Sequence, residues 1–276
     1  MMDLQPDRSF VRKMLSLGMD VYVIDWGYPT QVDRYKTMAD YILGNMNDAV
    51  DAIRKIAKTD KVNILGVCQG GTFSLIYASL FPEKVKNLIT LVTPVNFKTE
   101  NGLLFKWAKD MDVDAVVDGF DGVVPGDFLN SGFDLLKPMN KARKYMSMPE
   151  TMKNHDTLMN FLRMEKWVAD SPSQAGDTYR QFIKDMYQQN KLAEGKFELE
   201  GHKVNLKKID MPVLTIYASA DHIVPPDTTK PINDLIGSKD KELMEFPGGH
   251  IGVFVGGRSQ NVLTPAITDW LVKRDK

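Results

Sequence analysis

The sequence contains a single cysteine among 276 residues, so no disulfide can form within the chain. It has no apolar run near the roughly 20 residues that a membrane-spanning helix needs, and its N-terminus is not a signal peptide. The net charge is −1 and Lys and Arg are not clustered, which excludes a basic nucleic-acid-binding face. A composition of 43% hydrophobic and 26% charged residues is that of an ordinary globular protein, for which we expect a cytoplasmic location.

The cysteine lies in a pattern that predicts a nucleophile. Cys68 follows the apolar run 63–67 and stands between Gly66 and Gly70, with Gly71 next. This spacing is typical of a nucleophile elbow, a sharp turn between a strand and a helix. We expect Gly66 and Gly70 to be required because a β-carbon would collide in the turn, and Gly71 to let the helix pack closely. Without these glycines, a lone cysteine is more often a small buried apolar residue.

Hydrophobic periodicity predicts strands and helices that alternate along much of the chain. Short apolar runs predict strands at 21–24, 62–67, 88–92, 213–217 and 243–246. Helical spacing predicts helices at 7–17, 38–58, 72–80 and 264–272. Strands that are apolar on both faces and alternate with helices indicate an α/β protein with a mostly parallel sheet.

The alternation is interrupted between residues 96 and 206, where the spacing is helical and no comparable strand is predicted. We therefore expect a helical cap inserted between two parts of one core, residues 1–95 and 207–276. Half of the 16 methionines lie in this insertion. Methionine side chains adapt readily to an apolar guest or partner, although ordinary core filling explains them equally well.

An acid and a histidine each follow a predicted strand near the C-terminus. Asp221 follows the strand at 213–217, and His250 lies in a glycine-lined loop after the strand at 243–246. The order Cys68, Asp221, His250 is the nucleophile, acid and histidine order of α/β-hydrolases. Because open α/β sheets place their sites at the carboxyl ends of the strands, we predict that these three residues form a catalytic site.

The chain contains four histidines, and the other three are competing candidates for the base. His222 neighbours Asp221, so in an extended loop its side chain should point elsewhere. His155 and His202 lie in the predicted cap without a supporting motif. We expect both to be surface histidines or core histidines with satisfied hydrogen bonds.

Six segments of the sequence resemble the catalytic subunit of poly(3-hydroxyalkanoate) synthases, most closely the two-subunit class III type. They are 20–27, 66–71, 93–95, 161–167, 221–226 and 248–252, so the similarity runs nearly end to end. The resemblance implies an α/β-hydrolase fold with a helical cap. It also implies polymerisation of (R)-3-hydroxyacyl-CoA, in particular 3-hydroxybutyryl-CoA, with release of coenzyme A.

The resemblance also implies roles for the site residues. Cys68 carries the acyl group, His250 is the general base for its thiol, and Asp221 helps to activate the 3-hydroxyl that attacks the next thioester. The backbone N–H of Gln69 is the expected half of the oxyanion hole. Coenzyme A is then part of the substrate, and we expect no cofactor and no metal.

Several partners follow from the same resemblance. We expect a smaller second subunit, of the PhaE type or of the PhaR type if the chain belongs to class IV, together with further copies of the chain. The growing polyester would place the protein at the surface of a polyhydroxyalkanoate granule, and we expect no nucleic acid partner. Two alternatives are a cysteine hydrolase of the same fold and an inactive chain that only binds its partner or the granule.

Members of this family begin earlier than the present chain, and their fold includes a strand between those predicted at 21–24 and 62–67. We therefore expect N-terminal strands of the fold to be missing, with the loop that supplies the second oxyanion N–H. The structure should then show a gap between these two segments, or pairing of one with the other. Asp25 and Trp26 also match a family motif, although a buried polar anchor and a core aromatic explain them as well.

Overall fold

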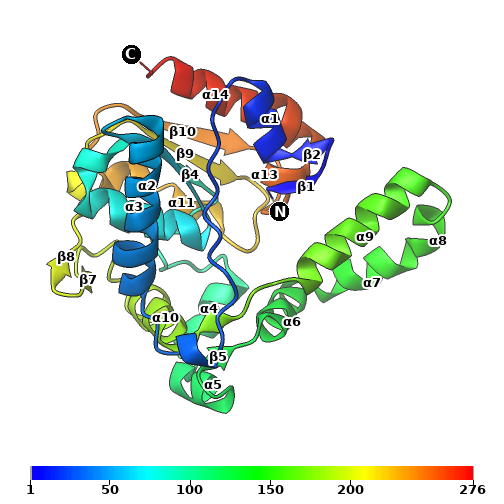
Figure 1. Cartoon of the computed structure of the whole chain (residues 1–276). Coiled ribbons are helices and arrows are strands. Elements are labelled where there is room, and N and C mark those ends of the chain that lie inside the picture. Colours follow the sequence, from blue (N-terminus) through cyan, green and yellow to red (C-terminus); the bar gives the residue numbers. More distant parts are fainter. Residues whose placement is uncertain (1, 276) are drawn as a thin grey trace.

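The computed structural model describes residues 2–275, except for the side chain of Lys141. At its centre lies a parallel sheet of four strands in the order β10-β9-β4-β3 (Figure 1). Its strands are β3 (Val62–Val67), β4 (Val85–Leu91), β9 (Val213–Ala218) and β10 (Lys241–Phe246). Four of the five predicted strands are therefore present, and the sheet is parallel as predicted.

Helices cover both faces of the sheet because successive side chains of its inner strands point to opposite sides. Leu88 and Val213 pack into one hydrophobic cluster, whereas Ile89 and Leu214 pack into another. The first cluster is covered by the π-helix η2 (Asp40–Met46), α2 (Asn47–Ala57) and α3 (Gln69–Leu80). The second is covered by α1 (Phe10–Ser16), α13 (Gly252–Val255) and α14 (Thr264–Val272). All four predicted helices are present, although α3 begins earlier than predicted.

Helix α1 is defined at both ends by local chemistry. The Ser9 hydroxyl accepts a hydrogen bond from the backbone N–H of Arg12, which caps the first turn. Gly18 follows the helix with φ +86°, a backbone conformation that glycine adopts without steric cost. Before the helix, the short strands β1 (Asp3–Gln5) and β2 (Arg8–Ser9) form an antiparallel pair.

The prediction of a strand at 21–24 is wrong. Residues 19–30 have no regular secondary structure, and Tyr22 and Val23 are exposed. A cavity of about 490 Å³ lies between this segment and the edge strand β3. No strand within residues 2–275 pairs with the backbone at 21–24, so its apolar composition alone does not produce a strand. The expected gap between 21–24 and β3 is present.

The chain between β4 and β9 is mostly helical. It contains α4 (Leu103–Asp110), α5 (Val113–Gly119), α6 (Gly126–Leu136), α7 (Pro138–Met146), α8 (Met148–Thr151), α9 (His155–Ala169), α10 (Gly176–Gln181) and the π-helix η4 (Phe182–Gln188). Two antiparallel pairs complete it, β5 (Val123–Val124) with β6 (Gln174–Ala175) and β7 (Glu198–Leu199) with β8 (His202–Lys203). Helices α7 to α9 project away from the sheet as an arm (Figure 1), whereas Phe182 and Met186 join the same core cluster as α3.

The methionines of this region are divided between the arm and the core. Met139, Met146 and Met152 are exposed on the arm, at 63%, 79% and 61%. Met186, in contrast, is fully buried beneath η4. Core filling therefore explains Met186 but not the three exposed methionines, Met139, Met146 and Met152.

The burial of α3 generates a prediction about stability. Replacing Ile76, which is fully buried in α3, with alanine should lower the free energy of unfolding by about 2–5 kcal/mol because it leaves a cavity. The matched change Ile56→Ala removes the same atoms from α2 at a position that is 65% exposed, and should change stability by less than about 0.5 kcal/mol. Urea unfolding followed by circular dichroism measures both. Equal losses would contradict the packing of α3.

Candidate active site

The turn between β3 and α3 holds Cys68 in a strained backbone conformation. Its φ is 50° and its ψ is −123°, a region that non-glycine residues rarely occupy and that costs on the order of 1–3 kcal/mol. The N–H of Cys68 donates to the carbonyl of Leu91 at 3.0 Å, and its own carbonyl accepts from Gly71 at 2.9 Å and Thr72 at 3.1 Å. These bonds tie the turn to β4 and to the first turn of α3.

Two of the three glycines around Cys68 are required by close contacts. A β-carbon on Gly66 would lie 2.6 Å from the Cα of Gly71, and one on Gly71 would lie 1.8 Å from the Thr93 hydroxyl oxygen. Both distances are far below any tolerated contact, so Gly71 does allow close packing as expected. The expected collision at Gly70 is wrong, because a β-carbon there would meet nothing within 4 Å.

Asp221 and His250 come together at the carboxyl ends of β9 and β10. The Nδ1–H of His250 donates to Oδ2 of Asp221 at 2.7 Å. The other carboxylate oxygen accepts from the backbone N–H groups of Ile223 and Val224, each at 2.9 Å. The Asp221 side chain is fully buried and that of His250 is 8% exposed. Three hydrogen bonds therefore fix the carboxylate, and the carboxylate in turn orients the imidazole.

The imidazole of His250 also faces Cys68. Burial by itself would lower the pKa of His250, but a thiolate charge on Cys68 and the hydrogen bonds to Asp221 and Cys68 raise that pKa to about 10. The ring therefore carries a positive charge at neutral pH, with the Asp221 carboxylate on one side and Cys68 on the other. Such a charge favours the thiolate, which is the nucleophilic form of cysteine.

The other three histidines do not bind the Asp221 carboxylate in the part of the chain that the structure describes. Oδ2 of Asp221 is bound by His250 rather than by His222. Burial lowers the pKa of His222, and the positive charge of Lys137 lowers it further. His155 on α9 and His202 on β8 are exposed, in agreement with their expected surface positions.

The expected alternative for Asp25 and Trp26, a buried anchor and a core aromatic, is wrong. Asp25 is exposed, and its carboxylate accepts from the N–H of Gly27 at 2.9 Å. Trp26 is 42% exposed and packs edge-on against Tyr41, with the ring centroids 5.9 Å apart. Both residues lie in the irregular segment that was predicted to end a strand, and without that strand neither is carried into the core.

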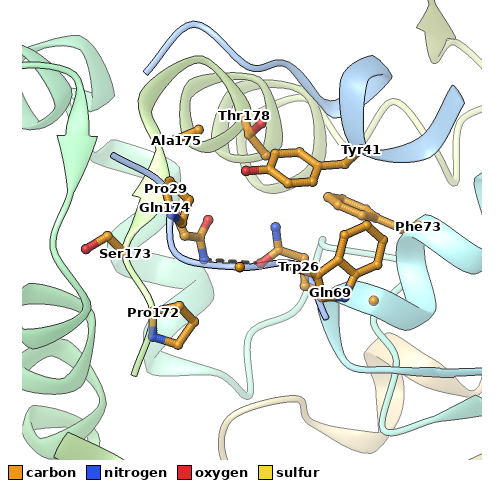
Figure 2. Close-up of a pocket in the computed structure, with 12 residues that line it drawn as sticks. Trp26, Pro29, Tyr41, Gln69, Phe73, Pro172, Ser173, Gln174, Ala175 and Thr178 are labelled. Carbon is orange, nitrogen blue, oxygen red and sulfur yellow. Dashed lines mark hydrogen bonds between the residues drawn. The ribbon is translucent and has the colours of Figure 1, made fainter. Parts of the chain in front are cut away.

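A pocket of about 210 Å³ lies beside the elbow (Figure 2). The rings of Trp26, Tyr41 and Phe73 lie along one side of it, and the opposite side is formed by residues 172–175. Across the pocket, the side-chain amide of Gln174 donates to that of Gln69 at 3.3 Å. The pocket is largely apolar and is contiguous with the residue that follows Cys68.

The sequence pattern marks Gln69 only for its backbone N–H and does not mark Tyr41 or Gln174. Tyr41 belongs to a helix that precedes the elbow, and Gln174 lies about a hundred residues after it. No local motif marks either residue. Only the folded chain brings them next to α3.

Comparison with known proteins first defines the class. The alpha/beta hydrolase fold family matches residues 3–257, so the chain belongs to that fold class. A monoacylglycerol lipase from Paleococcus ferrophilus superposes with a TM-score of 0.57 at 19% identity, over 96% of this chain and 88% of the lipase. A thermophilic esterase from Thermogutta terrifontis gives 0.51 at 16% identity, over 87% of this chain and 74% of the esterase. At these identities the likeness shows the fold alone.

The sequence relatives then define the family. The poly(3-hydroxyalkanoate) polymerase subunit PhaC of Thiocystis violacea is 50% identical over 275 residues, which cover 99% of this chain and 77% of that protein. The corresponding subunit of Synechocystis is 48% identical, over 99% of this chain and 74% of the relative. The chain therefore belongs to the poly(3-hydroxyalkanoate) polymerase PhaC family, whose members are acyltransferases. The predicted fold class and family are both confirmed.

No helix within residues 2–275 combines sufficient length with sufficient apolar character to cross a bilayer.

The charge on His250 predicts how Cys68 should react with iodoacetamide. His250→Ala removes the charged imidazole that faces Cys68, so alkylation at pH 7 should be several-fold slower than in the wild type. Because the imidazole keeps its proton up to a pH of about 10, the difference between the two rates should persist through neutral pH and disappear as the pH rises through that value. Alkylation quenched at a series of times and followed by intact-mass spectrometry measures both rates.

His222→Ala is the control for this experiment, since Asp221 binds His250 instead. Its alkylation profile should match that of the wild type. Equal alkylation rates for the wild type and His250→Ala at pH 7 would contradict a role for the charged imidazole.

Proposed function

We propose that this chain is the catalytic subunit of a polyhydroxyalkanoate synthase, which transfers 3-hydroxyacyl groups from coenzyme A thioesters into a polyester through Cys68. The observation that carries this proposal is the buried His250 imidazole, bound to Asp221 at 2.7 Å and facing Cys68 in the strained turn. The names of the relatives supply the reaction, since they are polymerases of 3-hydroxyalkanoates.

In the first step the Cys68 thiolate attacks the carbonyl carbon of the acyl-CoA thioester. A C–S bond to Cys68 forms as the C–S bond to coenzyme A breaks, and the leaving thiolate takes the proton from the His250 imidazolium. The N–H of Gln69 is the first backbone donor of α3, where N–H groups have no acceptor within the helix. It stabilises the negative charge that develops on the carbonyl oxygen.

In the second step the 3-hydroxyl of one acyl group attacks the carbonyl carbon of another thioester. The hydroxyl proton passes to His250, which is now neutral and is oriented by Asp221. An ester C–O bond forms as the thioester C–S bond breaks, and His250 returns the proton to the departing thiolate. Exchange between thioesters is nearly isoenergetic, so an acyl group on Cys68 stays reactive enough to be transferred.

The preferred substrate under this proposal is (R)-3-hydroxybutyryl-CoA. We also propose a smaller second subunit, of the PhaE type or the PhaR type, and association with further copies of the chain at a granule surface. The exposed methionines Met139, Met146 and Met152 on the arm support such a contact, because flexible apolar side chains suit adaptable interfaces.

The proposal predicts that the chain with 3-hydroxybutyryl-CoA releases coenzyme A and forms insoluble polyester. Cys68→Ala should abolish release, and His250→Ala should lower kcat by about a thousandfold or more, because both take part in each transfer. His155→Ala changes an exposed histidine on α9 and should leave the rate unchanged. Thiol release measured with a chromogenic disulfide, together with analysis of the product, provides the test.

The product distinguishes the proposal from its alternatives. Release of coenzyme A with free 3-hydroxybutyrate would indicate a cysteine hydrolase of the same fold. The absence of any acyl adduct on Cys68, despite binding to a second subunit, would indicate a chain that only binds. Either outcome would overturn the proposal.

A further inference from the structure

The pocket beside the elbow contains two amide side chains that face each other in largely apolar surroundings. Gln69 immediately follows the nucleophile and is the first residue of α3, and Gln174 comes from β6 on the opposite side. Figure 2 shows the two amides meeting in the pocket, next to the ring of Trp26. Cys68 does not itself line this pocket, which adjoins the nucleophile through the next two residues, Gln69 and Gly70.

The hydrogen bond between the two amides leaves much of their capacity unused. At 3.3 Å it is long for an N–H···O bond, which is normally 2.7–3.2 Å. Within residues 2–275 neither side-chain amide makes another hydrogen bond. A glutamine amide offers two N–H donors and an oxygen with two acceptor positions. The N–H groups of Gln69 and the oxygen of Gln174 are thus free to bind a ligand.

An adjacent donor and acceptor match one small group in particular. A hydroxyl donates one hydrogen bond and accepts others, so it satisfies both amides at once. The match does not depend on which way either amide is turned, because each amide carries both kinds of atom. A plain hydrocarbon chain would leave the same polar groups without partners, which costs free energy.

We infer that Gln69 and Gln174 form a site that recognises the 3-hydroxyl of the acyl group during its transfer to Cys68. The rings of Trp26, Tyr41 and Phe73 would then hold the short alkyl part of the same group. The pair selects hydroxyacyl thioesters over plain acyl thioesters, and so acts in recognition rather than in bond breaking. This inference rests on the proposed function, because it requires an acyl group on Cys68.

The test compares 3-hydroxybutyryl-CoA with butyryl-CoA in a single turnover. Both can acylate a cysteine, but only the first carries the hydroxyl, so the ratio of their acylation rates measures hydroxyl recognition. Gln174→Met keeps the length of the side chain and removes its hydrogen-bonding atoms. It should lower the ratio about three- to tenfold, the equivalent of one neutral hydrogen bond. The fall should come from the hydroxylated substrate, with the butyryl rate unchanged, and Gln69→Met should shift the ratio the same way.

Gln189→Met is the matched control, because it makes the same change at an exposed glutamine that does not line the pocket. Its ratio should equal that of the wild type. A ratio that stays unchanged in Gln174→Met while the wild type is acylated would overturn the inference and leave the proposed function intact. No acylation of the wild type by either thioester would overturn both.

Discussion

The backbone turn at Cys68 is the constraint on which the rest of the site depends. A residue with φ 50° and ψ −123° persists only where its surroundings hold it, and here β4 and the first turn of α3 do so through the backbone N–H and C=O of that same residue. Gly66 and Gly71 allow the strand and helix to approach closely enough for this turn. The sulfur is consequently placed at the end of the sheet where Asp221 and His250 also arrive.

The electrostatics of the site follow from the burial of Asp221 and His250. A carboxylate removed from water is costly unless it is bonded on all sides, and Asp221 is bound by two backbone N–H groups and by His250. With the carboxylate fixed, the imidazole gains a proton that it would otherwise lose on burial. In the proposed reaction, His250 gives this proton to the leaving thiolate in the first step, and in the second step it carries the hydroxyl proton to the departing thiolate.

The pocket beside the elbow and the cavity beside β3 differ in origin. The pocket is bounded by side chains from four separate parts of the chain, including the rings of Trp26, Tyr41 and Phe73, so its shape depends on the complete tertiary structure. The cavity exists because residues 19–26 pass the edge strand without pairing with it. Gly70 borders this cavity, and a β-carbon there would meet no atom within 4 Å. Close packing therefore requires Gly66 and Gly71 but not Gly70.

Local sequence determined much of the architecture. Strands β3, β4, β9 and β10 and their parallel arrangement follow from apolar runs that alternate with helices, and the glycines around Cys68 mark the turn. The order of Cys68, Asp221 and His250 along the chain was also sufficient to select the residues that the structure brings together. These features depend on short-range periodicity and on loops that end neighbouring parallel strands at one edge.

Only the tertiary structure decided the rest. Residues 21–24 have the composition of a strand, but a strand requires a neighbour with which to share hydrogen bonds, and no strand within residues 2–275 pairs with them. Asp221 could in principle have oriented either histidine, and the packing of the β9 and β10 loops selects His250. The meeting of Gln69 with Gln174 joins residues about a hundred positions apart. No local pattern encodes such a contact, since it arises from how the helical region folds back over α3.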